Sequence, residues 1–194
     1  NRTPPKTQAA LLEAMEERQA TIDGVRYALP FPFIVFATQN PIEFEGTYPL
    51  PEAQQDRFLL KVVLTYPAPE HELAVLKRFD QGFRALALDE AGVQKVLNAE
   101  SLRELRKEIQ KVRVEEKIFN YIYEIVSATR ANNNILIGAS PRAGLALVAG
   151  AKALAAVRDR DFVIPDDVKE LALPVMRHRV IIRPEVEIEG LTVD

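Results

Sequence analysis

The fold of this chain is decided by the stretch Phe33-Ile34-Val35-Phe36-Ala37-Thr38-Gln39-Asn40-Pro41. Its five apolar residues, 33–37, predict a strand that is covered on both faces, as in a parallel sheet. The stretch then turns polar, and Pro41 ends the pairing because proline has no N–H group to donate. In open α/β sheets, ligands lie in the crevice beyond the carboxyl ends of the strands. We therefore expect the amide of Asn40 to lie at a ligand site, although an asparagine before proline also caps turns well.

Two arginines follow this strand in recognisable local contexts. Residues 51–58 (PEAQQDRF) predict a short helix that ends at Arg57, where a cation complements the helix macrodipole whether or not it has a catalytic role. Ser140 and Pro141 have the residue types of an N-cap and a first helical position, so Arg142 falls at the positive end of its helix. A cation is disfavoured there. We expect a phosphate-like anion beside Arg142, and a salt bridge to a distant acid is the alternative.

Together these three segments resemble the AAA+ ATPases of the MoxR family. The resemblance covers nearly the whole chain, including residues 1–6 (NRTPPK) and 177–179 (RHR), and it differs at Gln55, where the family more often has leucine. It implies that Asn40 is the sensor 1 asparagine, Arg57 an arginine finger that reaches a neighbour's ATP, and Arg142 the sensor 2 arginine, which binds the phosphates of its own subunit. It further implies a homo-oligomeric ring, with a hexamer as the expected form, and chaperone-like remodelling of partner proteins, often ones with von Willebrand A domains.

The resemblance also implies ATP and Mg²⁺ as cofactors, but part of their site is not in this sequence. A phosphate loop needs glycines followed by Lys-Ser or Lys-Thr. The one Lys followed by Thr is Lys6, and prolines rather than glycines precede it. Two sheet strands, 33–37 and 59–64, cannot cover each other's faces and edges. We therefore expect the chain to be a fragment that lacks the Mg²⁺ ligands and is inactive as an ATPase alone.

The predicted fold class is α/β plus all-α: the C-terminal half of an AAA+ αβα core, followed by a helical lid. We place the core at residues 1–66 and the lid at 67–194, because residues 66–69 (YPAP) break the pattern. Around Asp23-Gly24 the sequence predicts a β-hairpin, which the resemblance relates to a pre-sensor insertion and which is otherwise a surface decoration. Further predictions are helices at 90–97, 102–112, 116–130, 141–158 and from 165, and a ribbon formed by residues 180–182 and 186–188.

Composition excludes several functional classes. The 194 residues carry a net charge of −3, with 47% apolar and 27% charged residues, which is typical of a globular protein. No apolar run approaches the roughly 20 residues that span a bilayer. Without cysteine there are no disulfides or thiolate metal sites, and we expect a cytoplasmic protein. The two histidines, at 71 and 178, have no partners at ligand spacing, so we expect no metal site of the chain's own.

Two rival functions remain open at this level. One is a non-catalytic helical interaction module derived from an AAA+ fold. The other is a DNA-dependent AAA+ motor, but a net charge of −3 does not favour nucleic acid binding. We interpret the cluster Arg177, Arg179 and Arg183 as a solvated basic face, and Asp166-Asp167 as helix capping.

Overall fold

The computed structural model describes residues 4–39, 50–84 and 92–194, and it divides into two compact units. One unit comprises Asn1–Lys61 and Arg106–Asp194, and the other comprises Val62–Leu105. These units divide the chain by compactness, so the boundary that we place between core and lid at residues 66 and 67 stays a prediction.

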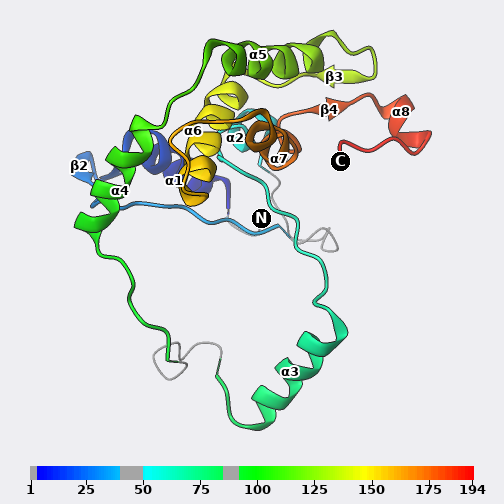
Figure 1. Ribbon diagram of the computed structural model, residues 1–194. Coiled ribbons are helices and arrows are strands. Elements are labelled where there is room, and N and C mark those ends of the chain that lie inside the picture. The colour runs from blue at the N-terminus through cyan, green and yellow to red at the C-terminus, as the bar shows by residue number, and fades with distance from the viewer. Residues whose placement is uncertain (1–3, 40–49, 85–91) are drawn as a thin grey trace. The chain divides into compact units, whose positions relative to one another are not determined.

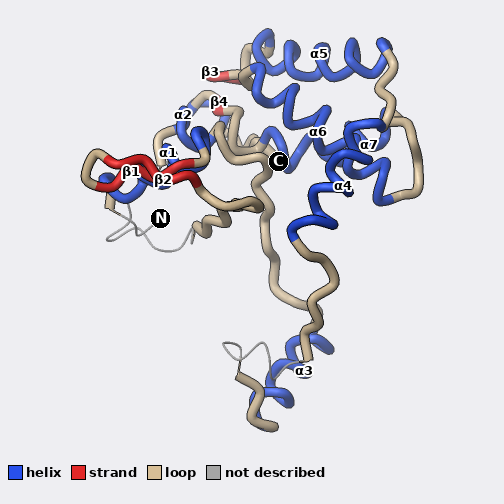
Figure 2. Tube along the Cα trace, turned by 90° about the vertical axis from the view of Figure 1, so that its left-hand side faces the viewer, coloured by secondary structure: helices blue, strands red, loops and turns tan. Residues whose placement is uncertain are grey.

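The first unit begins with a helix and a hairpin. Helix α1 (Pro5–Glu17) leads into β1 (Gln19–Ile22), which pairs antiparallel with β2 (Val25–Ala28). Both turn residues have positive φ angles, 51° at Asp23 and 78° at Gly24, as a two-residue hairpin requires. Figure 2 shows this hairpin beside α1, which contacts β1. The hairpin predicted from the Asp-Gly pair is confirmed.

Three helices and a small ribbon form the core of the first unit. Helix α6 (Pro141–Val157) packs against both α5 (Glu116–Ala131) and α7 (Pro165–Met176), as Figure 1 shows. Ala143, Leu147, Ala151 and Ala155 of α6 are fully buried. Among the described helices α6 has the most buried residues, because alanines along one face let its neighbours approach closely. The other buried apolar side chains of this core come chiefly from Ile118, Ile122, Val126, Val163, Val168 and Val175.

The C-terminal segment differs from its prediction. Residues 186–188 do not pair with 180–182; instead β4 (Ile181–Ile182) pairs antiparallel with β3 (Ile135–Ile137). Pro184 begins a short helix, α8 (Pro184–Ile188). Proline at the first helical position is pre-set for a helix and has no N–H for a strand ladder, which explains why the weak alternation after it was misleading.

The two strands predicted at 33–37 and 59–64 are not formed among the described residues. Apolar side chains in both segments are exposed, with 91% of Phe36 and 89% of Leu64 accessible to solvent. In the second segment the N–H of Lys61 donates to the carbonyl oxygen of Pro174 on α7 rather than to a strand. A strand forms only when it is hydrogen-bonded to a neighbouring strand. No described strand pairs with residues 33–37 or 59–64. Asn40 lies outside the described residues.

Over its described residues, the second unit contains one helix and the start of another, and neither of these helices has a buried residue. Helix α3 (Pro69–Asp80) has no buried residue, and it begins with two acids and ends with two bases, as the macrodipole favours. Residues 92–98 are not helical, so the helix predicted at 90–97 is wrong over its described part. Helix α4 (Ala99–Lys111) begins at a capping box in which Asn98 and Ser101 exchange hydrogen bonds, and its last turns belong to the first unit.

Candidate functional site

A short helix positions the first of the two candidate arginines. Helix α2 (Glu52–Gln55) ends at Asp56, its C-cap, so Arg57 is the next residue beyond the helix. The side chain of Gln55 donates to the carbonyl oxygen of Leu50 at 2.7 Å and closes the segment on itself. The polar residue that departs from the family pattern thus has a local role.

Arg57 and Arg142 converge on one carboxylate oxygen. Oε1 of Glu16, on α1, lies 3.0 Å from Nε of Arg57 and 3.1 Å from Nη2 of Arg142. Both arginine side chains remain partly accessible, 29% for Arg57 and 49% for Arg142. Nε of Arg57 is covered but makes no well-aligned hydrogen bond to a described residue. The attraction to Glu16 is therefore mainly electrostatic, and two guanidinium groups from distant segments share one anion.

Arg142 lies where the sequence predicts it, in the first turn of α6. Oγ of Ser140 accepts a hydrogen bond from the backbone N–H of Arg142 at 3.2 Å, which confirms Ser140 as the N-cap. The salt bridge that we hold as the alternative for Arg142 is present, to Glu16, and a second carboxylate oxygen, Oδ2 of Asp56, lies 3.8 Å from its Nη1. An anion does compensate the cation at this helix end, and here it is a protein side chain.

The carboxylate of Asp56 joins α2 to the segment after α7. Its Oδ1 accepts a hydrogen bond from Nε of Arg179 at 2.9 Å. Both of its oxygens also lie within hydrogen-bonding distance of Oγ of Ser140, at 2.9 and 2.8 Å. Arg179 is 7% exposed and Asp56 has 18% of its side chain exposed, so this contact is largely shielded from water. The interpretation of Arg179 as part of a solvated basic face is wrong.

His178 supports the same junction. Its Nε2 lies 3.0 Å from the carbonyl oxygen of Phe58, and because a carbonyl only accepts, Nε2 carries the proton. Nδ1 is buried and has no hydrogen-bond partner among residues 4–39, 50–84 and 92–194. Burial is the main cause that lowers the pKa of His178 below its usual 6.5, and the nearby Arg179 and Lys61 lower it further. The imidazole is therefore neutral at physiological pH.

No sequence pattern assigned Glu16, Asp56 or Arg179 to the candidate site, and Arg179 was assigned to a solvated face. Each is a single charged residue in an ordinary helical or loop context, and its partner is distant in the chain, 126 positions from Glu16 to Arg142 and 123 from Asp56 to Arg179. One signal does exist in the sequence, because Asp56 directly precedes Arg57. If Arg57 is to bind a phosphate, the neighbouring carboxylate needs a different cation as its partner.

A second charged cluster, around Asp167, does not include Arg57 or Arg142 and has a structural role. Asp167 is fully buried in the first turn of α7, where it binds both terminal nitrogens of Arg160 and approaches Arg158. Its Oδ2 accepts from the N–H of Ile164 at 3.0 Å, so the capping predicted for Asp166-Asp167 is confirmed at Asp167. Burial raises the pKa of Asp167, but the hydrogen bonds from Arg160 and Ile164 outweigh it and the net pKa is lowered.

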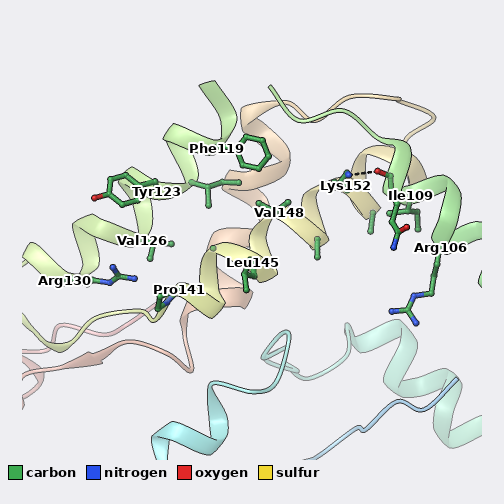
Figure 3. A pocket seen from close by; sticks show the side chains of 15 residues that line it. Arg106, Ile109, Phe119, Tyr123, Val126, Arg130, Pro141, Leu145, Val148 and Lys152 are labelled. Carbon is green, nitrogen blue, oxygen red and sulfur yellow. Dashed lines mark hydrogen bonds between the residues drawn. The ribbon is translucent and has the colours of Figure 1, made fainter. Parts of the chain in front are cut away.

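An apolar cavity of about 820 Å³ opens between α5, α6 and the last turns of α4, as Figure 3 shows. Its apolar lining includes Phe119, Leu145 and Val148. Its charged lining residues are all cationic: Arg106, Arg130 and Lys152. Nζ of Lys152 donates to the carbonyl oxygen of Gln110 at 2.6 Å and Nε of Arg130 to that of Ala139 at 2.8 Å, so in the described part of the chain neither is neutralised by an acid.

Neither a metal centre nor a membrane helix is found in the parts of the chain that the structure describes. No group of three or more histidine, aspartate or glutamate side chains there is arranged to hold a metal ion. No described helix is both long enough and apolar enough to cross a bilayer.

Comparison with known proteins identifies both halves of this arrangement. Residues 1–60 match the ATPase family associated with various cellular activities (AAA), and residues 127–194 match the AAA lid domain. The crystal structure of a putative ATPase from Cytophaga hutchinsonii superimposes with a TM-score of 0.89 at 45% identity, over 99% of this chain and 59% of that one. The fold is therefore α/β plus all-α, the C-terminal half of an AAA+ αβα core followed by a helical lid.

Curated relatives agree with this assignment. The chain is 47% identical to the uncharacterized protein YeaC of Bacillus subtilis over 98% of its own length, and 41% identical to the chaperone MoxR1 of Mycobacterium tuberculosis over 94%. It is also 33% identical to the protein MoxR of Paracoccus denitrificans over 96% of its length. It spans 58%, 49% and 59% of these three relatives. The chain belongs to the MoxR family of AAA+ ATPases.

Proposed function

We propose that this chain supplies the arginine finger, the sensor residues and the lid of a MoxR-like ATPase, which hydrolyses ATP at subunit interfaces and uses the energy to remodel partner proteins. The observation that carries the proposal is the convergence of Arg57 and Arg142 on one oxygen of Glu16. Two partly exposed guanidinium groups around a single anion have the charge and donor geometry that suit a phosphate group.

In this proposal Glu16 occupies the place of a phosphate when no nucleotide is bound. Phosphoryl transfer depends on positioning and on stabilising charge at the transferred group, and an arginine finger accelerates it by about 10³–10⁵-fold. That acceleration corresponds to roughly 4–7 kcal/mol of activation free energy. Arg57 is assigned this catalytic role. Its contact with Glu16 uses Nε, and its two terminal nitrogens make no hydrogen bond to a described residue. Arg142 is assigned to ATP binding.

The shared carboxylate supports a common ligand for the two arginines. The family resemblance implies that Arg57 serves a neighbour's ATP and Arg142 that of its own subunit, which would place them at different nucleotides. Contact with one oxygen of Glu16 favours action of both on the same phosphates. We propose this arrangement, so that Arg142 assists Arg57 in trans, and the mixing experiment below distinguishes it from action in cis.

The remaining assignments rest on the family. Asn40, outside the described residues, would orient the attacking water through its amide, which both donates and accepts. Bound ATP supplies the phosphoryl group and Mg²⁺ neutralises its charge; no residue of this chain is assigned as a Mg²⁺ ligand. We propose a homo-oligomeric ring, a hexamer, in the cytoplasm, with client proteins that include von Willebrand A domains and no nucleic acid.

The test is Arg57→Ala in the whole protein. We expect ATP turnover to fall by about 10³-fold or more, while the dissociation constant for ATP stays unchanged. Arg113→Ala is the matched control, because the exposed side chain of Arg113 pairs with Asp161 and not with Glu16. Loss of ATP binding in Arg57→Ala would contradict the role in trans. Turnover by the 194-residue chain alone would contradict the expectation that it is inactive by itself.

Mixing of subunits tests the position of Arg142. Arg142→Ala subunits are combined with Arg57→Ala subunits, each inactive alone. If both arginines act in trans on the same site, every interface that combines the two variants lacks one arginine, and turnover stays low. If Arg142 acts in cis, an Arg142-intact site that receives Arg57 from an Arg142→Ala neighbour is complete, and mixing restores part of the turnover.

A second function, that of a non-catalytic interaction module, is favoured by one observation, the apolar cavity with its cationic lining. It predicts that Leu145→Glu, which puts a negative charge on the exposed lining of the cavity, abolishes partner binding, while Arg57→Ala changes nothing. Normal client remodelling by Arg57→Ala in a protein that turns over no ATP would favour this module over the ATPase.

A further inference from the structure

We propose that Arg179 and Asp56 form a latch through which the lid positions Arg57, so that Arg179 is a positioning residue for hydrolysis. The inference rests on the catalytic role proposed for Arg57 and assigns the junction between α2 and the segment after α7 a function of its own. Neither residue contacts the nucleotide in this scheme; both act through the backbone on either side of Arg57.

All five N–H donors of Arg179 have acceptors. Nε donates to Oδ1 of Asp56 at 2.9 Å, and Nη2 donates to the backbone carbonyl of Asp56 at 3.0 Å and to that of Phe58. Nη1 donates to the carbonyl of Leu59 at 3.2 Å and to that of Val175 on α7. A guanidinium has five donors in a fixed plane and no acceptor, so the side chain is fully committed to this junction.

Three of these carbonyl groups belong to residues within two positions of Arg57. The carbonyls of Asp56 and Phe58 belong to the residues on either side of it, and Leu59 follows. Binding of the Asp56 and Phe58 carbonyls to one rigid plane restrains the short stretch of backbone between them, which contains Arg57. Arg179 therefore limits the directions in which the Arg57 side chain can leave the chain.

The burial of this pair argues that it does more than add stability. The Arg179 side chain is 2% exposed, and burial lowers its pKa although the hydrogen bond to Asp56 opposes the shift. Removing two charges from water costs several kcal/mol per ion, and an apolar pair of similar volume is often as stable. The need to position the backbone around Arg57 explains why residue 179 is an arginine.

The lid contacts the same carboxylate from a second helix. Oγ of Ser140 binds Asp56 and also caps α6 at Arg142. The backbone that starts the helix of Arg142 and the backbone that carries Arg57 thus meet at one carboxylate. A shift of the lid that follows phosphate binding at Arg142 would displace Asp56, and with it Arg57.

The decisive variant is Arg179→Lys, which keeps the positive charge but has three donors on a flexible stem. In the whole protein we expect turnover to fall by about 10- to 100-fold, as expected for displacement of a catalytic group by about 1 Å. The dissociation constant for ATP should stay within about twofold of wild type, since only transition-state contacts are lost. Arg177→Lys is the control. Arg177 is close to Arg179 in the sequence, but it pairs with Asp194 rather than with residues 56–59.

A double-mutant cycle separates positioning from general structure. On an Arg57→Lys background, whose residual turnover is measurable, Arg179→Lys should have little further effect, because residues that act through one another are non-additive. An equal fold-loss on both backgrounds overturns the latch while leaving the proposed function intact. Unchanged turnover in Arg57→Ala overturns the proposed function, and the latch with it.

Asp56→Asn keeps the test decisive if Arg179→Lys does not fold. The amide retains the shape of the carboxylate and one acceptor oxygen but removes the charge that pairs with Arg179. We expect the same loss of turnover at unchanged ATP affinity, and the same non-additivity with Arg57→Lys. Full turnover in a folded Asp56→Asn protein overturns the latch.

Discussion

Gly138 lies against the backbone of Arg130, at the end of α5. A Cβ atom added at Gly138 would stand 2.8 Å from both Cα and N of Arg130, and backbone atoms at this distance have to move. The contact is held by two hydrogen bonds, from Arg130 Nε to the Ala139 carbonyl and from the Ala139 N–H to Thr129 Oγ1. We expect Gly138→Ala to lower the free energy of unfolding by about 1–3 kcal/mol, measured by chemical denaturation.

Gly144 provides the matched control for this prediction. It lies within α6, and a Cβ there would meet Ile122 Cγ2 at 3.8 Å, an ordinary contact. Because alanine is favoured over glycine in a helix interior by about 1 kcal/mol, Gly144→Ala should be neutral or stabilising. Equal losses from the two substitutions would show that the approach of Gly138 to Arg130 has no energetic importance.

Local sequence patterns predicted the elements whose determinants are local. The Asp23-Gly24 turn, the Ser140-Pro141 start of α6 and the caps of α7 each depend on residues within four positions of one another. These features were correct because side-chain chemistry at a turn or cap acts directly on the adjacent backbone.

The elements that failed depend on distant partners. The apolar run 33–37 is typical of a buried strand, but strand pairing requires a neighbour that the described residues do not provide. Ile181 and Ile182 pair with β3, some 45 positions earlier in the chain, and not with the nearby residues 186–188. The same limit applies to the candidate site: Arg57 and Arg142 were found by resemblance, while their common acid Glu16 carries no local signal.

Glu16→Gln tests whether this acid competes with phosphate. The neutral amide weakens the attraction that holds Arg57 and Arg142 on Oε1. Since partly exposed ion pairs contribute about 0–1 kcal/mol, we expect ATP to bind up to about fivefold more tightly to the whole protein, measured by titration calorimetry. Glu13→Gln is the control, because Glu13 lies one turn earlier on α1 and accepts a hydrogen bond from Thr21. Weaker binding in Glu16→Gln would instead assign Glu16 to holding the arginines in place.

His178 should make stability depend on pH near neutrality. Its pKa is 6.5 when unfolded and lower in the fold, chiefly through burial, so the unfolded state binds the proton more readily. Stability is full above pH 6.5 and falls as the pH drops below it, by up to about 1.4 kcal/mol per pH unit. In denaturation curves between about pH 7.5 and pH 5, a range that includes the ordinary pKa of histidine, His178→Gln should show the smaller slope. An unchanged slope in His178→Gln would contradict the assignment.

Asp167 should stabilise the lid at neutral pH and lose this effect in acid. The carboxylate is fully buried, and its hydrogen bonds from Arg160 and Ile164 lower its pKa below 3.8 against the opposing effect of burial. Loss of one partner from a buried pair costs about 3–5 kcal/mol, and because 20% of the Arg160 side chain is exposed we expect about 3 kcal/mol for Asp167→Ala at pH 7.

The pH dependence of this loss provides a second readout of the same variant. A lowered folded pKa means that the stabilisation is complete above pH 3.8 and disappears as the pH falls through the folded value. The unfolding free energies of wild type and Asp167→Ala should therefore converge below pH 3.8. Asp166→Ala, at the exposed neighbour in the same turn, should cost only the roughly 0.3–1 kcal/mol of a helix-end charge. A constant difference between wild type and Asp167→Ala down to acid pH would mean that packing, and not the ionised carboxylate, stabilises the start of α7.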